Sequence, residues 1–425
     1  MRLYLRSLDP QLSQPVWLLQ LGGLMNFFGN GIVFPFLVIY LHDVRGFSLT
    51  TAGLVIAASS GAQLVAGIGA GALIDVIGPK RLLAGGLVLQ AVGFGLFPLV
   101  QEPWHAFVLI TIEGAGSAGF WPSQSTLMSR LVDDRRRHNA FAVQRATMNL
   151  GIGLGGIVGG LIATVSDPRS FTILFVVDAL TFVLYIGALA FVPDPGVSRE
   201  ESEQPSSYGT VLRHKTFVAL WMLNFTFVAA GIAMLNLVPP FVKDHAGVSE
   251  REIGVFFFVN TIVIVILTLP LSRWLEGRLR LRAIAIMPLL FAAAWLVVDA
   301  AGIWLEATTA FAVLLVAALM LGVGECFHGP AHIALIADIG SPHLRGRYFA
   351  VHSLSWGLAG AVGPAIGGAI LDHEPFALWP LAAAACVVAA AGWFSVQRFL
   401  PAHLQRIPRT DAQPVSRPPL PVGAE

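Results

Sequence analysis

Gly155-Gly156-Ile157-Val158-Gly159-Gly160 decides the fold, because a close copy, Gly363-Pro364-Ala365-Ile366-Gly367-Gly368, returns 208 positions later. The same interval relates Gly114 to Gly322, Pro122 to Pro330, and residues 141–143 to residues 349–351. A second echo, at an interval of 201, links two sets of four residues: Asp43, Gly46, Ser48 and Gly53 with Asp244, Gly247, Ser249 and Gly254. Repeats of about half the 425-residue chain are too long for a solenoid and predict two homologous lobes.

The composition indicates a protein of the lipid bilayer. Charged residues make up 12% of the chain, against roughly 25% in soluble domains, while apolar residues make up 56% and the mean hydropathy is +0.73. Apolar runs long enough to cross a membrane are predicted at about 15–40, 51–74, 82–100, 105–130, 141–164, 170–192, 216–241, 251–271, 283–300, 310–338, 348–370 and 378–397. An apolar chain of two such lobes is typical of a transporter whose substrate lies between them.

The basic residues predict the orientation. With a cytoplasmic N-terminus, only four of the 26 lysines and arginines fall in outer loops, namely Arg45, Arg169, Lys243 and Arg251. This positive-inside bias predicts a multi-pass protein of the cell (inner) plasma membrane with both termini in the cytoplasm. The first apolar run is too long for a signal-peptide core, so we expect it to be retained as the first helix.

Two polar stretches divide the chain. We expect an N-terminal lobe at 1–193, a cytoplasmic linker at 194–215, a C-terminal lobe at 216–398 and a disordered tail at 399–425. The two cysteines, Cys326 and Cys386, lie inside apolar runs, so no disulfide framework is predicted.

Enzyme motifs are not supported. Residues 114–119 match the dinucleotide fingerprint G-x-G-x-x-G, but they lie inside an apolar run with no preceding strand, which favours close helix packing. The sequence contains no Walker A motif and no nucleophile elbow. We therefore expect no enzyme activity, no cofactor, no resident metal and no nucleic-acid partner, and transport driven by an ion or solute gradient.

The segment Gly71-Ala72-Leu73-Ile74-Asp75-Val76-Ile77-Gly78-Pro79-Lys80-Arg81 resembles the signature loop of the major facilitator superfamily, in the expected place between the second and third helices. The resemblance implies an all-α membrane protein of about twelve transmembrane helices in two pseudo-symmetric six-helix lobes. It also implies a gating role for five residues: Gly71, Asp75, Gly78, Lys80 and Arg81. The loop departs from the family at Val76, where a basic residue is usual, and its second-lobe copy at 273–278 is degenerate.

The glycine run at 151–160 resembles the family's antiporter motif through Gly151, Gly155, Gly159 and Gly160, with Gly156 in place of proline. Close helix packing alone would explain the same spacing. The segment 29–35 resembles the drug:proton antiporter branch of the superfamily, which implies proton-coupled efflux.

Polar residues at membrane depth are the candidates for the substrate and proton path. Glu325, His328 and His332 have the spacing of one helix face, and Glu113 and Gln124 fall on the equivalent stripe of the fourth helix. A proton or substrate role, a metal site and a satisfied hydrogen-bond network remain alternatives for the first three residues.

The first and seventh helices add further candidates to that path. Asn26, Asn30 and Asn224 are polar, and Asn26 stands where the resemblance leads one to expect an acid. Trp121 and neighbouring aromatic residues are expected to form an apolar cavity wall. Asp178, on the sixth helix, is expected to be structural.

The function predicted from these features is secondary active transport, as proton-coupled efflux of amphipathic small molecules by alternating access. The partners are a small-molecule substrate, protons and the lipid bilayer, and the chain is expected to be a monomer. The alternatives are a facilitator for a sugar or organic anion, and a transporter-like sensor or assembly factor.

Overall fold

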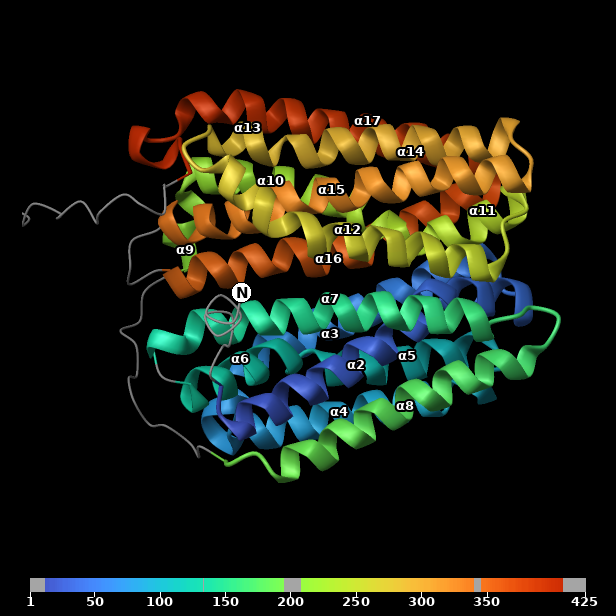
Figure 1. Cartoon of the computed structure of the whole chain (residues 1–425), viewed down its shortest axis with the longest axis horizontal. Helices are drawn as coiled ribbons and strands as arrows, with labels where there is room; N and C mark the ends of the chain where they lie inside the picture. Colours follow the sequence, from blue (N-terminus) through green and yellow to red (C-terminus); the bar gives the residue numbers. More distant parts are fainter. Residues whose placement is uncertain (1–11, 133, 195–207, 340–344, 408–425) are drawn as a thin grey trace, which may run out of the picture.

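The computed structural model describes residues 12–132, 134–194, 208–339 and 345–407, which form a bundle of helices in two lobes (Figure 1). The N-terminal lobe contains α2 (Gln14–Ile39), the π-helical turn η1 (Tyr40–Val44), α3 (Leu49–Ile77), α4 (Pro79–Gly95), η2 (Phe97–Leu99), α5 (Pro103–Ser117), α6 (Phe120–Leu131), α7 (Asp134–Ile162) and α8 (Pro168–Ala190). The C-terminal lobe contains α9 (Tyr208–Arg213), α10 (Lys215–Ala230), η3 (Ile232–Leu237), α11 (Val238–Ala246), α12 (Glu250–Leu275), α13 (Arg280–Ile284), α14 (Ile286–Trp304), α15 (Ala307–Ile339), α16 (Arg345–His373), α17 (Pro375–Val396), η5 (Gln397–Phe399) and η6 (Ala402–Leu404).

The helices confirm an all-α membrane protein. Within the described part of the chain, 11 spans are long and apolar enough to cross a membrane. The predicted fourth span, 105–130, is divided at residues 118–119 into α5 and α6, of 15 and 12 residues, which together complete the expected twelve. The predicted seventh span is also discontinuous, because α10 stops at Gly231 and the chain continues as the 3₁₀ turns of η3 before α11.

The lobes meet along two helix pairs, with α3 packed on α16 and α7 packed on α12. Each lobe has its own aromatic core. Phe94 and Phe175 stack with ring centroids 6.3 Å apart in the N-terminal lobe, while Trp295 and Trp379 lie 5.2 Å apart in the C-terminal lobe. Because the ring contacts of Phe94 and Trp379 lie within their own lobes, the lobes can move relative to each other without separating these rings.

The sequence echo at an interval of 201 corresponds to two matching turns. Gly46 and Gly247 both have positive φ, of 72° and 64°, which residues with a side chain rarely adopt. Ser48 and Ser249 follow them and cap α3 and α12 respectively. These turns lie at what we call the far end, where η1 and α16 end; the opposite end, where α2 and α10 begin, is the near end (Figure 1).

Part of the predicted linker and part of the predicted tail are folded. The linker's last residues form α9, whose Val211 is buried against Tyr348 of α16. Ordered structure also continues past residue 399 through η6, and Arg406 forms an isolated antiparallel bridge with Leu279. The start of the expected disordered tail is therefore packed, whereas residues 195–207 and 408–425 lie outside the described residues.

Candidate functional site

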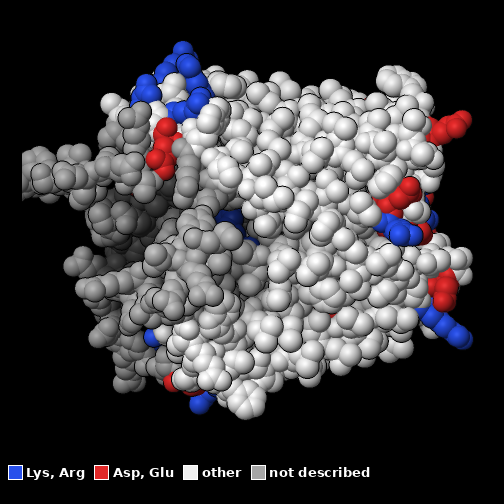
Figure 2. Space-filling model, viewed as in Figure 1, with Lys and Arg blue, Asp and Glu red and all other residues white. Residues whose placement is uncertain are grey.

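Glu325 of α15 faces the gap between the lobes at mid-helix. Its half-buried carboxyl group lies beside the Asn260 side chain of α12 and within electrostatic range of Arg145, which extends from α7 of the other lobe. Figure 2 shows basic side-chain atoms set back in the hollow between the two lobes. An acid and an exposed base from opposite lobes therefore lie within electrostatic range of each other.

Glu113 of α5 is enclosed within the N-terminal lobe. It is 4% exposed, and its Oε2 accepts a hydrogen bond of 2.7 Å from Ser59 Oγ of α3. Asp178 of α8 is fully buried nearby and interacts electrostatically with Glu113. No hydrogen-bond donor among the described residues reaches either oxygen of Asp178. The two candidate acids thus differ, because Glu325 faces the other lobe and Glu113 does not.

His332 does not join Glu325 in one site. It is completely buried, with its ring centroid 4.9 Å from that of His352 on α16 and 6.2 Å from that of Trp393 on α17. Although the two residues share a helix face, helices cross one another at an angle, so the same face meets α12 near Glu325 and α16 two turns later. The side chain of His328 lies outside the described residues.

Gln124 belongs to a buried hydrogen-bond network inside the N-terminal lobe. Its Nε2 donates to the Tyr185 hydroxyl group at 3.1 Å, and its Oε1 accepts from Gln144 Nε2 at 2.7 Å. In the C-terminal lobe, Asn224 Nδ2 similarly donates to Ser355 Oγ at 2.8 Å. Because these amides are occupied by neighbouring side chains, they offer little hydrogen-bonding capacity to a substrate.

The residues on α2 differ from one another in exposure. Asn26 is buried, and no donor among the described residues reaches its Oδ1, whereas Asn30 is half-buried. Phe27 lies beside them and contacts Phe120 and Trp121, with ring centroids 5.7 and 5.6 Å away. Trp121 is 45% exposed, so this aromatic cluster presents an accessible apolar surface.

Three glycines of the antiporter-like motif bring α7 into close contact with α2. Methyl groups added at Gly151 and Gly159 would lie 2.8 Å from the Leu24 carbonyl oxygen and 2.7 Å from the Ile32 carbonyl oxygen. Gly155 faces the same helix, next to the Phe28 carbonyl group. Because no side chain fits at these positions, the motif serves close packing; its link to antiport stays a prediction.

Glycines also bring the lobes together at the far end. Gly160 of α7 faces Gly254 of α12, and a methyl group on Gly160 would lie 2.9 Å from the Gly254 Cα atom. Gly368 of α16 faces Gly53 of α3, and a methyl group there would lie 3.2 Å from the Gly53 Cα atom. The 208- and 201-residue intervals relate these two pairs, so they are symmetry mates across the interface.

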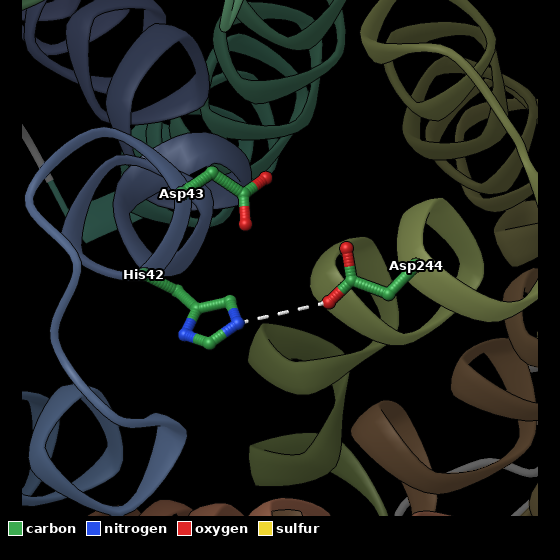
Figure 3. A group of neighbouring side chains, drawn as sticks. All are labelled: His42, Asp43 and Asp244. Atoms are coloured by element: carbon green, nitrogen blue, oxygen red, sulfur yellow. Dashed lines mark ion pairs between the residues drawn. The ribbon is translucent and has the colours of Figure 1, made fainter.

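Four charged or titratable residues form a cluster between the lobes at the far end, which we call the far-end clamp: His42, Asp43, Lys243 and Asp244. Figure 3 draws His42, Asp43 and Asp244. Lys243 pairs with Asp43, and His42 Nε2 lies 3.9 Å from Asp244 Oδ2. Each lobe thus contributes a base followed by an aspartate, and each base faces the aspartate of the other lobe. His42 Nδ1 lies 2.7 Å from the Phe47 carbonyl oxygen, so Nδ1 carries a hydrogen and Nε2 faces Asp244.

The clamp also has the donor atoms of a metal site, since ligand atoms of His42, Asp43 and Asp244 lie within 4.8 Å of one another. The Lys243 ammonium group already neutralises Asp43, which favours the ion-pair role. Asp372 at the end of α16 adds a further tie between the lobes. Its carboxylate accepts hydrogen bonds from Leu49 N at 3.1 Å and from Thr50 Oγ1 at 2.8 Å, which caps α3 of the other lobe.

The sequence matches a known family over nearly its whole length. Residues 19–298 and 221–421 match the profile described as Major Facilitator Superfamily. The chain belongs to this superfamily. It is therefore a multi-pass membrane transporter and not an enzyme.

Relatives and solved structures agree with the superfamily assignment. The chain is 26% identical over 359 residues to "Multidrug resistance protein MdtH" of Cronobacter sakazakii, covering 83% of this chain and 87% of that protein. It is 23% identical to the protein of the same name from Escherichia coli O1:K1, covering 89% and 94%. A POT family transporter in complex with a thioalcohol conjugated peptide has a similar fold, with a TM-score of 0.78 at 14% identity, covering 90% and 96%. A bacterial homolog of the human lysosomal transporter Spinster, in an inward-facing conformation, has a TM-score of 0.70 at 16% identity, covering 90% and 96%.

The signature loop of this major facilitator fold is partly described. Gly78, with φ of 87°, forms the whole connection between α3 and α4. Lys80 Nζ donates a hydrogen bond of 2.6 Å to the Val192 carbonyl oxygen beyond α8, and Arg81 is exposed. Gly71 lies within α3, and the side chain of Asp75 lies outside what the structure describes, so the gating role of both residues stays a prediction.

Sequence reasoning missed Arg145 and the far-end clamp. Arg145 had a detectable signal, because it is a charged residue inside the predicted fifth span at 141–164. For the clamp, the echo relating Asp43 to Asp244 also aligns His42 with Lys243, so the two dipeptides could have been recognised as equivalents.

Proposed function

We propose that this transporter exports amphipathic small molecules across the inner membrane in exchange for protons, by alternating access. The observation that carries the proposal is that Glu325 lies within electrostatic range of Arg145, which belongs to the other lobe. An ionised Glu325 attracts Arg145, whereas a protonated Glu325 does not. Proton binding therefore changes the interaction between the lobes at mid-membrane depth, which is what coupling requires.

The far-end contacts supply the second element of alternating access. With a cytoplasmic N-terminus, as the positive-inside bias predicts, the far end is the outer end. Three sets of contacts hold the lobes together there: the far-end clamp, the Asp372 cap and the paired glycines. We interpret these contacts as an outward gate in its closed state. Opening this end requires separating groups that the two lobes contribute in symmetric pairs.

The chemistry of the interior supports an amphipathic substrate. Trp121, which packs on the buried Phe27 ring, offers an accessible aromatic surface, while the amides of Gln124 and Asn224 are bonded to neighbouring side chains. A site for a sugar would instead need unoccupied hydrogen-bonding groups directed at the substrate. The relatives named as multidrug resistance proteins support the same substrate class.

Reconstitution into proteoliposomes with an imposed pH gradient tests the proposal. Glu325→Gln fixes the neutral form, so we expect the variant to exchange an amphipathic dye but to accumulate it at least about tenfold less against a gradient. Arg145→Gln should also impair accumulation. Glu113→Gln should retain accumulation, and Glu306→Gln, an exposed acid in the loop before α15, is the matched control.

Two results would contradict the proposal. If Glu325→Gln still pumps uphill and Glu113→Gln does not, the coupling acid lies on α5. If no dye moves but sugars or organic anions equilibrate without a pH gradient, the protein is a facilitator for polar metabolites.

A further inference from the structure

The second-lobe counterpart of the signature loop contains a basic cavity at the near end. The loop between α12 and α13 has a glycine with positive φ, Gly277 at 77°, as its first-lobe equivalent has Gly78 at 87°. The sequence of this copy has lost the family pattern, and its only acid is Glu276. A cavity of about 310 Å³ opens beside it, between α12, α13 and the C-terminal segment.

The C-terminal segment fixes the shape of this cavity. Gly277 N donates to the Ile407 carbonyl oxygen at 2.8 Å, Ile407 N donates to the Arg278 carbonyl oxygen at 3.0 Å, and Arg280 N donates to the Gln405 carbonyl oxygen at 2.8 Å. These backbone hydrogen bonds attach a short extended stretch of chain to the loop. One wall of the cavity is therefore a backbone segment that these hydrogen bonds hold in a fixed position.

Three arginines line the cavity, and none of them has a carboxylate partner among the residues that the structure describes. Arg278 lies over the Trp274 ring, with its guanidinium carbon 3.4 Å from the ring centroid. Arg406 donates a hydrogen bond of 2.7 Å to the Gly277 carbonyl oxygen, and Arg282 is exposed. By contrast, the adjacent Arg280 is buried and pairs with Asp338 at 3.0 Å, outside the cavity.

The remaining walls are apolar. Leu279 and Ile286 face the cavity, and Trp274 is 52% exposed at its rim. The membrane span Arg280–Trp304 begins within the cavity wall, so the cavity lies where the bilayer interface meets the near end. Figure 2 shows a basic cluster at the corresponding end of the upper lobe. Tryptophan is enriched at this depth of the membrane.

We propose that this cavity binds the headgroup of an anionic phospholipid from the cytoplasmic leaflet. A guanidinium group can donate two parallel hydrogen bonds to two oxygens of one phosphate group. The three arginines, which have no carboxylate partner among the described residues, supply the opposite charge. Leu279 and Ile286 would contact the first carbons of the acyl chains. A free anion would gain nothing from these apolar walls or from Trp274, which is why a lipid fits the site better than a soluble phosphate. The inference depends on the near end being cytoplasmic but not on the transported substrate.

Native mass spectrometry of the full chain tests this proposal. The delipidated protein is titrated with phosphatidylglycerol or with phosphatidylcholine of the same acyl chains. We expect at least about tenfold tighter binding of phosphatidylglycerol. Arg282→Gln and Arg406→Gln should each weaken it about fivefold, and the double variant about 25-fold, since each basic side chain near an anionic surface contributes on this scale.

Arg398→Gln is the matched control, because this arginine also lies near an aromatic ring at the same end, 4.9 Å from the Phe399 centroid, but outside the cavity. It should leave binding unchanged. Equal binding of the two lipids by the unmodified protein would overturn the proposal without recourse to any variant. Full displacement of phosphatidylglycerol by millimolar inorganic phosphate would also overturn it and assign the cavity to a free anion.

Discussion

Replacing Gly160 by alanine should open the far end of the transporter. The added methyl group would lie 2.8 Å from the Glu250 carbonyl oxygen and 2.9 Å from the Gly254 Cα atom. Both are backbone atoms of α12, so they cannot move aside by changing a rotamer. The clash can be relieved only by separating α7 from α12, which belong to different lobes.

The magnitude follows from the difference between the two conformations. Overpacking costs typically about 1–3 kcal/mol, and this cost falls on the closed far end alone. The gain in helix propensity from glycine to alanine, about 1 kcal/mol, is the same in both conformations and cancels. The ratio of closed to open molecules should therefore fall by roughly 5- to 150-fold.

Spin labels on opposite lobes measure this ratio directly. Ser166 in the loop after α7 and Thr308 at the start of α15 are both exposed at the far end, and Cys326 and Cys386, which are buried, are first replaced by alanine. Pulsed dipolar spectroscopy should show a longer distance gaining population in the Gly160→Ala protein.

A matched control separates the clash from the general effect of the substitution. Gly187 of α8 has no neighbouring atom within 4 Å of an added methyl group, so Gly187→Ala should leave the distance distribution unchanged. Gly368→Ala, the symmetry mate of the test variant, should shift it in the same direction as Gly160→Ala. An unchanged distribution for both Gly160→Ala and Gly368→Ala would refute the idea that these glycines close the far end.

Three further predictions address other contacts. A double-mutant cycle of Asp43→Asn and Lys243→Gln should give a coupling energy of about 1 kcal/mol for the equilibrium between the closed and open far end, measured from the same distance populations, since the pair is partly buried. A coupling energy near zero would show that the pair does not hold the gate closed. Asp75→Asn should weaken closure of the near end by about 1 kcal/mol and slow turnover without unfolding the protein. Labelling of introduced cysteines from the two sides of the membrane would detect the change, and an unchanged inside-to-outside labelling ratio would argue against the gating role of Asp75. Burial lowers the pKa of His214, which lies against the Tyr348 hydroxyl group, below its usual 6.5. The unfolded chain then binds the proton more readily, so this residue's contribution to stability is complete above about pH 6.5 and is lost as the pH falls. Thermal unfolding of the wild-type protein should therefore lose more stability between about pH 7.5 and pH 5 than His214→Gln, and parallel curves would disprove the linkage.

The sequence by itself determined the two lobes, the apolar spans and the pairing of residues between the repeats. These properties follow from composition, from hydrophobic run length and from intervals along the chain, none of which requires knowledge of distant contacts. The 208-residue interval relates Gly160 to Gly368, and the 201-residue interval relates Gly53 to Gly254. In the structure Gly160 faces Gly254 and Gly368 faces Gly53 across the interface. Symmetry in the sequence thus predicted equivalent positions, but not that they would meet.

Only the tertiary structure decided which polar groups share a site. Glu325 and His332 have the spacing of one helix face, yet one lies beside Asn260 and the other against His352. Helix periodicity fixes the direction of a side chain relative to its own axis, whereas the crossing angles of the neighbouring helices decide what it meets. Arg145 likewise became a candidate partner for Glu325 only through the docking of the two lobes, because no pattern within either repeat encodes a contact between them.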